Sequence, residues 1–172
     1  MAFEKDLQQL LDEHAIRKVL MRYCRGIDRR DFDLVRSCYH TDGTDNHGTY
    51  QGSIAGFIDY LRAELPRYEQ TMHVVANVLI ELEGECAWSE AYTIAHHRLH
   101  ATATKPHRDY TVGLRYVDRF ERREDRWAIV DRQCVFSWSR MDSVPPGYAF
   151  PTSYTLSSAI PTDPIYQQSF GR

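Results

Sequence analysis

The pattern of residues changes at Pro66, and this change limits the folds open to the chain. Before Pro66, apolar residues recur at three- and four-residue steps, as they do on one face of a helix. After it, residues 71–82, 86–100, 109–121 and 126–140 are rich in β-branched and aromatic side chains and are separated by short polar breaks. Helices followed by a meander of four antiparallel strands predict an α+β domain.

Capping residues and prolines divide the chain further. A first helix is expected to run to about Ile27, a second to follow Asp31, and a third to run from Ile54 to about Leu65. Residues 41–52 are polar and predict a loop with at most a short strand. Five prolines in the last thirty residues predict an extended tail. We therefore expect a domain at 1–142 and a tail at 143–172 that packs on its own or a neighbouring subunit.

Charge and cysteine usage exclude several classes of protein. The formal charge of −3 provides no basic surface for nucleic acid or anionic lipid. No apolar run approaches the roughly 20 residues of a membrane helix, and the N-terminus lacks a secretory signal pattern. A cytoplasmic location is the resulting expectation. The four cysteines form no CxxC pair, so we interpret them as reduced, buried side chains rather than as a zinc or redox site.

The candidate chemistry centres on His73, which lies in the strand-like run 71–78. A buried imidazole needs a hydrogen-bond partner, and Asp28, at the end of the first helix, could supply one. A carboxylate that holds one ring nitrogen leaves the other free to act as a general base. The same pattern is also compatible with a structural histidine bonded to backbone or water.

Hairpin geometry suggests which residues accompany His73. A two-residue turn at Gly84-Glu85 places His73 opposite His96, whereas a one-residue bulge would bring in Ala95 or His97 instead. Because adjacent strand residues face opposite ways, at most one of His96 and His97 faces a pocket. The charged run 115–126 is interpreted as a solvated strand edge and turn.

A metal site is not predicted. His73, His96 and His100 could in principle hold an ion, but no carboxylate or sulfur companion lies at a suitable spacing. We therefore expect no metal ion at these residues.

The order of these features resembles a known family. The chain resembles the SnoaL-like branch of the nuclear-transport-factor-like superfamily. The resemblance is carried by Tyr23-x4-Asp28, by Met72-His73 at the start of a meander, and by residues 118–122 and 127–130 (DRFER and WAIV). This branch contains scytalone dehydratase, bile-acid 7α-dehydratase and hexachlorocyclohexane dehydrochlorinase. The resemblance spans roughly residues 8–140 and implies a cone-shaped α+β barrel, with N-terminal helices packed on a curved, mainly antiparallel sheet.

The resemblance also implies a function. In these relatives an Asp–His pair drives elimination without a cofactor, and Asp28 and His73 match that pair by position. The expected activity is a dehydratase-like lyase acting on a small apolar cyclic substrate. The expected protein is a homo-oligomer, with a trimer favoured and a dimer possible. The residues expected to contact substrate are Tyr23, His96, Asn77, Tyr110 and Phe136.

Two other functions stay open. A ketosteroid-isomerase-like proton shuttle would need a carboxylate base in the pocket, and only Glu90 and Asp131 are acids in the middle of a predicted strand. A non-catalytic module that binds small ligands or mediates oligomerisation is the third reading, because this type of fold does not by itself establish chemistry.

Overall fold

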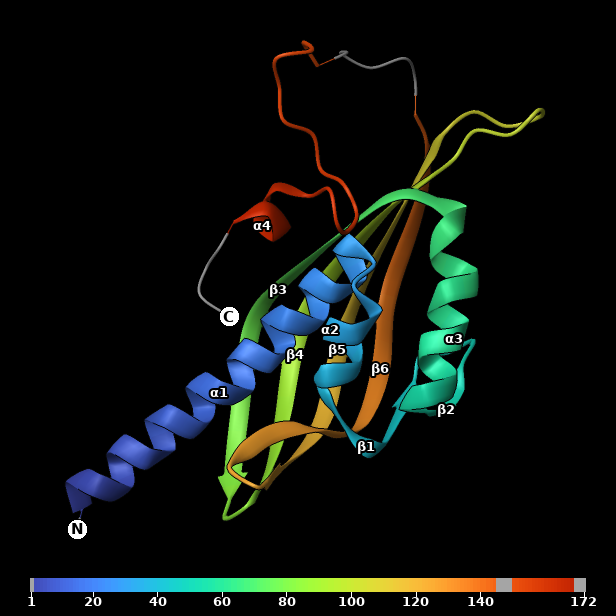
Figure 1. Ribbon diagram of the computed structural model, residues 1–172. Helices are drawn as coiled ribbons and strands as arrows, with labels where there is room; N and C mark the ends of the chain where they lie inside the picture. The colour runs from blue at the N-terminus through green and yellow to red at the C-terminus, as the bar shows by residue number, and fades with distance from the viewer. Residues whose placement is uncertain (1, 145–149, 169–172) are drawn as a thin grey trace.

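A computed structural model describes residues 2–144 and 150–168 of the chain (Figure 1). Three helices come first, with two short strands among them, and four long strands follow, as the sequence predicts. The elements are α1 (Ala2–Arg29), α2 (Phe32–Ser37), β1 (Tyr39–Asn46), β2 (Gln51–Ser53), α3 (Ile54–Glu64), the 3-10 turn η1 (Leu65–Arg67), β3 (Tyr68–Glu83), β4 (Cys86–Leu99), β5 (Arg108–Arg123), β6 (Arg126–Ser143) and α4 (Pro164–Gln167).

The six strands form one curved sheet in the order β2-β1-β6-β5-β4-β3. All neighbouring strands are antiparallel except β1 and β6, which are parallel. Helix α1 packs across β3 and β6, and α3 packs against β1 and β2, so the helices cover one face of the sheet (Figure 1). The edge strands β2 and β3 do not pair with each other, so the described sheet is an unclosed cone. The α+β prediction is confirmed.

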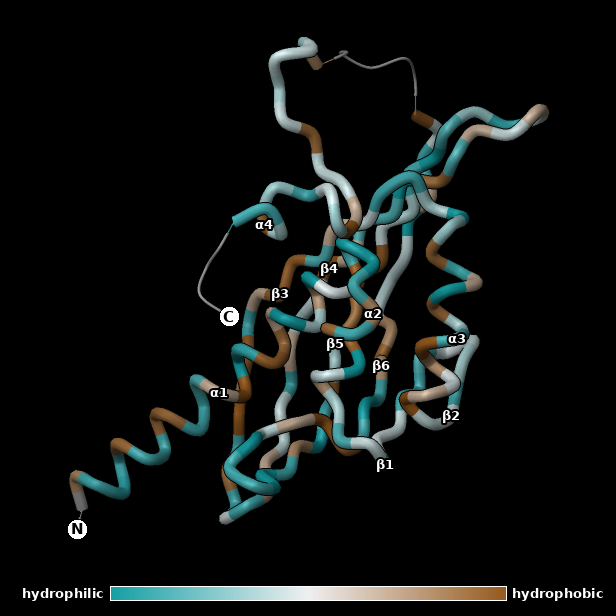
Figure 2. The backbone as a smooth tube through the Cα atoms, viewed as in Figure 1, coloured by the Kyte–Doolittle hydropathy of each residue, from teal (hydrophilic) through white to brown (hydrophobic). Residues whose placement is uncertain are grey.

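Helix α1 is buried only along its second half. Ile16, Leu20 and Ile27 are almost fully buried and pack into the core, and the apolar spacing of the sequence predicts this face. The first turns extend past the sheet, where brown apolar positions alternate with polar ones (Figure 2). Leu7 and Leu10, which continue the apolar spacing toward the N-terminus, are 44% and 64% exposed. The periodicity of the sequence predicts a helix, but it does not show where the sheet beneath that helix ends.

The segment predicted to be a loop contains two strands. β1 and β2 include Asp, Gly and Asn, which have low strand propensity. They form because β1 pairs with β6, with Thr44 opposite Asp131 and Asp45 opposite Arg132. Tertiary pairing therefore overrides local propensity at this edge.

The β3–β4 hairpin begins as predicted and then shifts. Glu83 pairs with Cys86 beside the turn, but a bulge lies between Val75 and Val78, and beyond it His73 lies opposite Ala95. A bulge adds one residue to one strand, and this exchanges the faces to which the following side chains point. The pairing of His73 with His96 was therefore wrong, and the alternative with a bulge is confirmed.

A buried ion pair lies at the centre of the sheet. Arg132 on β6 is fully buried and donates two hydrogen bonds to Asp118 on β5, at 2.7 and 2.6 Å. The guanidinium lies 4.1 Å from the ring centres of both Tyr23 and Tyr116. The interpretation of residues 115–126 as solvated is therefore wrong for Asp118. Its side chain points into the core, as do those of Tyr116 and Phe120, two residues away on either side.

The described part of the predicted tail returns to the end of α1. The Ile160 amide donates to the Arg29 carbonyl oxygen at 2.9 Å, and Arg29 forms an ion pair with the nearly buried Asp163 at 2.8 Å. Asp163 also caps the short helix α4, a regular element that the proline pattern does not predict. Residues 145–149 and 169–172 of the predicted tail lie outside the described residues. Among the described helices, none is both long and apolar enough to cross a membrane.

Candidate active site

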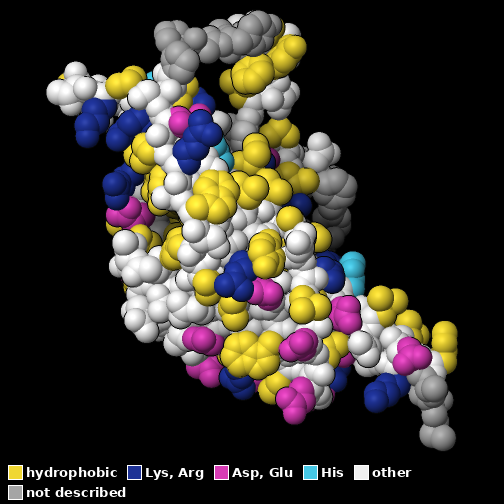
Figure 3. Space-filling model, turned by 180° about the vertical axis from the view of Figure 1, so that it is seen from behind, with side chains coloured by type: hydrophobic (Ala, Val, Ile, Leu, Met, Phe, Trp, Pro, Cys, Tyr) yellow, Lys and Arg dark blue, Asp and Glu magenta, His cyan; other side chains and the backbone are white. Residues whose placement is uncertain are grey.

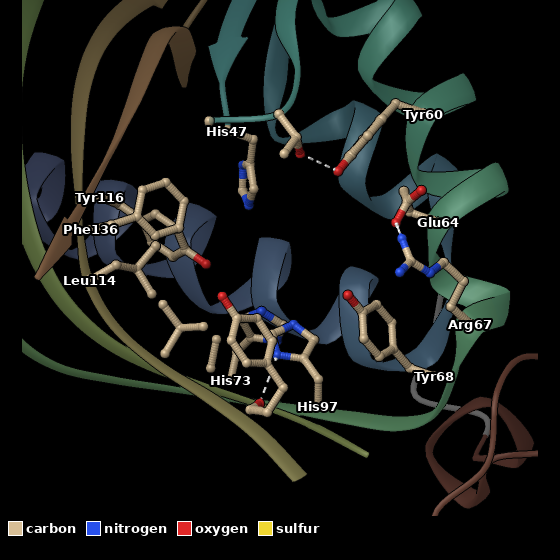
Figure 4. A pocket seen from close by; sticks show the side chains of 15 residues that line it. His47, Tyr60, Glu64, Arg67, Tyr68, His73, His97, Leu114, Tyr116 and Phe136 are labelled. Carbon is tan, nitrogen blue, oxygen red and sulfur yellow. Dashed lines mark hydrogen bonds and ion pairs between the residues drawn. The ribbon is translucent and has the colours of Figure 1, made fainter. Parts of the chain in front are cut away.

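A cavity of about 380 Å³ opens between the helices and the curved sheet (Figure 4). Its size is within the range of small-molecule sites. One wall is formed by β3, β4 and β5, and the opposite wall by the β1–β2 turn and α3. The lining residues are His47, Gly48, Thr49, Tyr60, Glu64, Arg67, Tyr68, His73, Ala95, His97, Tyr110, Val112, Leu114, Tyr116 and Phe136.

Asp28 and His73 meet at the sheet wall of this cavity. Nδ1 of His73 lies 2.7 Å from Oδ1 of Asp28, and the His73 backbone N–H donates to Oδ2 at 3.0 Å. The Thr71 hydroxyl donates to Oδ1 at 2.9 Å. The His73 side chain is only 5% exposed and that of Asp28 12%. The carboxylate thus fixes the orientation of the imidazole through Nδ1 and leaves Nε2 as the ring nitrogen available to a ligand.

His97 is a second imidazole on the same wall, two residues beyond Ala95. Its Nδ1 lies 3.3 Å from the Tyr110 carbonyl oxygen, and its ring meets that of His73 edge to face at 5.6 Å between centroids. Burial, followed by the nearby His73, lowers the pKa of His97 to about 4. His97 is therefore neutral at neutral pH, and its Nδ1–H donates to the carbonyl while Nε2 can accept a hydrogen bond.

His47 is a third imidazole, across the cavity from His73 and His97 (Figure 4). Its Nδ1 lies 3.0 Å from Oδ1 of Asp45, whose side chain is fully buried. The Tyr39 hydroxyl donates to the other oxygen of Asp45 at 2.6 Å. The His47 ring packs on Phe57 with 5.0 Å between ring centroids. Sequence reasoning missed this pair because residues 41–52 were interpreted as a loop, although Asp45-x-His47-Gly48 is visible in that segment.

Cys134 on β6 adjoins the same pair. Its Sγ lies 3.2 Å from Nδ1 of His47, and the ligand atoms of Asp45, His47 and Cys134 lie within 4.8 Å of one another. Such a group could hold a metal ion only with the thiol ionised. Burial, reinforced by the negative charge of Asp45, raises the pKa of Cys134 well above its ordinary value. Without a bound metal ion, the cluster is therefore a hydrogen-bonded Asp–His pair beside a neutral thiol.

Not all residues predicted to contact substrate line the cavity. Tyr110 and Phe136 do, and Tyr23 lines a smaller inner chamber that shares His73 and His97 with it. Asn77 is exposed beside the β3 bulge and lies outside both chambers. His96 lies on the opposite face of β4 from the buried Ala95, and its Nε2 pairs with Asp109 at 3.3 Å.

Comparisons with known proteins agree with this architecture. Residues 8–133 match the family described as the SnoaL-like domain.

The fold is also similar to those of solved structures. They include a hexachlorocyclohexane dehydrochlorinase from Novosphingobium barchaimii (TM-score 0.71, 18% identity, covering 82% of this chain and 99% of that one). A protein of Kribbella flavida has a TM-score of 0.70 at 20% identity, with 77% and 95% covered. A candidate scytalone dehydratase from Novosphingobium aromaticivorans has a TM-score of 0.69 at 14% identity, with 86% and 97% covered. At these identities the likeness shows the fold.

Proposed function

The chain belongs to the SnoaL-like domain family, and from this premise we propose that it is a cofactor-independent lyase that uses Asp28 and His73 to eliminate a small leaving group. The observation that carries the proposal is the 2.7 Å contact between the Asp28 carboxylate and Nδ1 of His73 on the wall of a cavity of about 380 Å³. A histidine base held by a carboxylate is suited to abstract a proton from carbon.

In the proposed mechanism, Nε2 of His73 removes a proton from a carbon beside an activating carbonyl group. The electron pair of that C–H bond forms the new double bond, and the leaving group departs from the next carbon. Asp28 stabilises the imidazolium that results and maintains its orientation. General base catalysis accelerates a reaction by roughly 10²- to 10⁴-fold, so positioning in the cavity has to contribute the rest.

The cavity lining supports a small, largely apolar cyclic substrate. Leu114, Val112 and Phe136 provide apolar contacts, and Tyr110 can hydrogen-bond a carbonyl oxygen. The position expected for His96 is taken by His97, whose neutral ring accepts a hydrogen bond. Tyr23, in the inner chamber, is a further candidate contact.

An isomerase-like proton shuttle has less support. Glu90 pairs with Arg115, and Asp131 accepts a hydrogen bond from Thr44; neither carboxylate lines the cavity. Among the described residues that line the cavity, Glu64 provides the carboxylate, and it forms an ion pair with Arg67 at 2.6 Å. The base that an isomerase would need is therefore lacking among the lining residues described.

We also propose that the protein works in the cytoplasm as a homo-oligomer, with a trimer favoured over a dimer. The outer face of the sheet has apolar side chains that are about half exposed, including Trp88, Tyr92 and Ile94 (Figure 3). Several exposed apolar side chains on one face are typical of subunit interfaces. The exposed apolar positions at the start of α1 are consistent with the same role.

The test is a screen of cyclic β-hydroxy and β-chloro ketones for elimination, repeated with the His73→Ala and Asp28→Asn variants. We expect both variants to lose turnover while circular dichroism and the melting temperature stay close to the wild type. Near-normal rates in both variants would contradict the mechanism. Binding without turnover by the wild type would favour the ligand-binding alternative.

A further inference from the structure

We propose that Asp45 and His47 form a second acid–base dyad, which faces Asp28–His73 across the cavity and protonates an oxygen leaving group. The inference rests on the proposed function and extends it, because it identifies the class of leaving group. It starts from the observation that two imidazoles in one cavity each have Nδ1 held by a carboxylate, at 2.7 Å for His73 and 3.0 Å for His47.

The position of His47 is fixed by a tight turn between β1 and β2. The His47 amide donates to the Tyr50 carbonyl oxygen at 2.7 Å, and the Thr49 amide donates to the His47 carbonyl oxygen at 3.0 Å. Gly48 has a φ of +78°, and a Cβ there would lie 3.1 Å from the Phe136 ring. The turn therefore holds the imidazole against the cavity, in keeping with a preorganised acid.

The two carboxylates differ in how their charge is balanced. Asp28 receives three hydrogen bonds from groups that can all be neutral, namely the Thr71 hydroxyl, the His73 amide and Nδ1–H of His73. This set satisfies the carboxylate without a cation, so His73 can be a neutral base.

Asp45 is placed differently. Its side chain is fully buried and hydrogen-bonds to the Tyr39 hydroxyl and the His47 ring. The nearby guanidinium of Arg132 donates from Nε and Nη2 to both oxygens of Asp118, and its buried Nη1 has no hydrogen-bond partner among the described residues. The buried cluster thus has two carboxylates and one guanidinium, and a second cation is needed for neutrality. An imidazolium at His47 supplies it, whereas Cys134, Tyr116 and Tyr39, which also face the ring or its carboxylate, contribute no positive charge.

The two dyads then act in one elimination. Nε2 of His73 takes the proton from carbon, and the C–H electron pair becomes the π bond. The bond between the next carbon and the leaving oxygen breaks with its electron pair on oxygen, and Nε2–H of His47 donates its proton to that oxygen, which leaves as water. His73 ends protonated and His47 neutral. His73 then releases its proton to solvent and His47 takes one up, which restores both.

This arrangement specifies the leaving group. Hydroxide is a poor leaving group and needs a proton as the C–O bond breaks, whereas chloride departs as a stable anion and needs none. A charged imidazole across the cavity from the base therefore points to hydroxylated substrates, and the reaction is a dehydration rather than a dehydrohalogenation.

The test compares two cyclic ketones that differ only in a β-hydroxyl or a β-chlorine, with the spontaneous rates subtracted. We expect His47→Gln to lower kcat/KM for the hydroxyl ketone by about 10²-fold or more, and for the chloro ketone by less than about tenfold. His73→Gln should lower both, and His96→Gln, outside the cavity, should change neither. Equal losses with His47→Gln on both ketones, or no loss on either, would overturn the inference while leaving the proposed function standing. If His73→Gln changed neither rate, the proposed function itself would fail.

A second measurement needs no substrate. Nitrogen NMR of the histidine rings at neutral pH should show His47 protonated on both nitrogens and His97 on one, with His47 losing a proton in Asp45→Asn. A neutral His47 in the wild-type protein would overturn the inference. So would activity that is lost with a chelator and restored by Zn²⁺, because Nδ1 would then be a metal ligand.

Discussion

At the scale of single residues, the cavity is defined by what holds Nδ1 of each of its three imidazoles. His73 and His47 have carboxylates, and His97 has the backbone carbonyl of Tyr110. Because Nδ1 is occupied in each ring, Nε2 is the nitrogen left for a ligand. The sequence predicts the Asp28–His73 contact because a histidine in an apolar strand needs a partner. It did not predict Asp45–His47, whose strand is formed by pairing with β6 rather than by its own residues.

The pKa of His97 makes folding stability depend on pH. Burial lowers this pKa from 6.5 to about 4, so between these values the unfolded chain binds a proton that the folded protein excludes. The contribution of neutral His97 to the free energy of unfolding is therefore complete above about pH 6.5 and is lost as the pH falls toward 4. His97→Gln should flatten this part of the profile of unfolding free energy, measured by urea denaturation. His96→Gln is the matched control, and a similar flattening there would contradict the assignment.

At the scale of elements, one bulge decides which side chains face the ligand. The turn at Gly84-Glu85 and the strand alternation are visible in the sequence, and both are confirmed. The bulge between Val75 and Val78 has no clear signal in the residues, because its position depends on how β3 bends beneath α1. The prediction therefore had the correct strands and the wrong histidine.

The β5–β6 pair depends on the buried ion pair of Asp118 and Arg132. Asp118→Asn should lower the free energy of unfolding by about 3–5 kcal/mol, because it leaves a buried guanidinium uncompensated. Asp131→Asn, one residue from Arg132 but exposed, should cost less than about 1 kcal/mol. Chemical denaturation of both variants measures this difference, and equal losses would show that the ion pair does not stabilise the sheet.

At the scale of the whole molecule, the helices and the curved sheet enclose the cavity and leave the outer face of the sheet uncovered. The order of helices and strands could be predicted because each long strand and each capped helix has its own sequence signal. The exposed start of α1 could not, because exposure depends on where the sheet ends. The division into a domain at 1–142 and a tail at 143–172 stays a prediction.

The outer face predicts how the protein assembles. With a chain of 20.1 kDa, light scattering should give about 60 kDa for the trimer that we favour. Trp88→Glu, on the exposed apolar face, should shift the mass toward that of one chain because it places a charge in the interface. Asp59→Asn, at an exposed position of α3, is a control that should leave the mass unchanged. A wild-type protein that is monomeric at micromolar concentration would contradict the proposal.

The central claim is that His73, oriented by Asp28, removes a proton from carbon. The most direct measurement is the transfer of deuterium from solvent to the α-carbon of a cyclic β-hydroxy ketone, followed by NMR together with formation of the unsaturated product. We predict that the wild-type protein catalyses exchange and elimination, that Asp28→Asn slows both by about 10²-fold or more, and that Thr71→Val slows them less. Wild-type rates of exchange and elimination in both Asp28→Asn and His73→Gln would contradict the account.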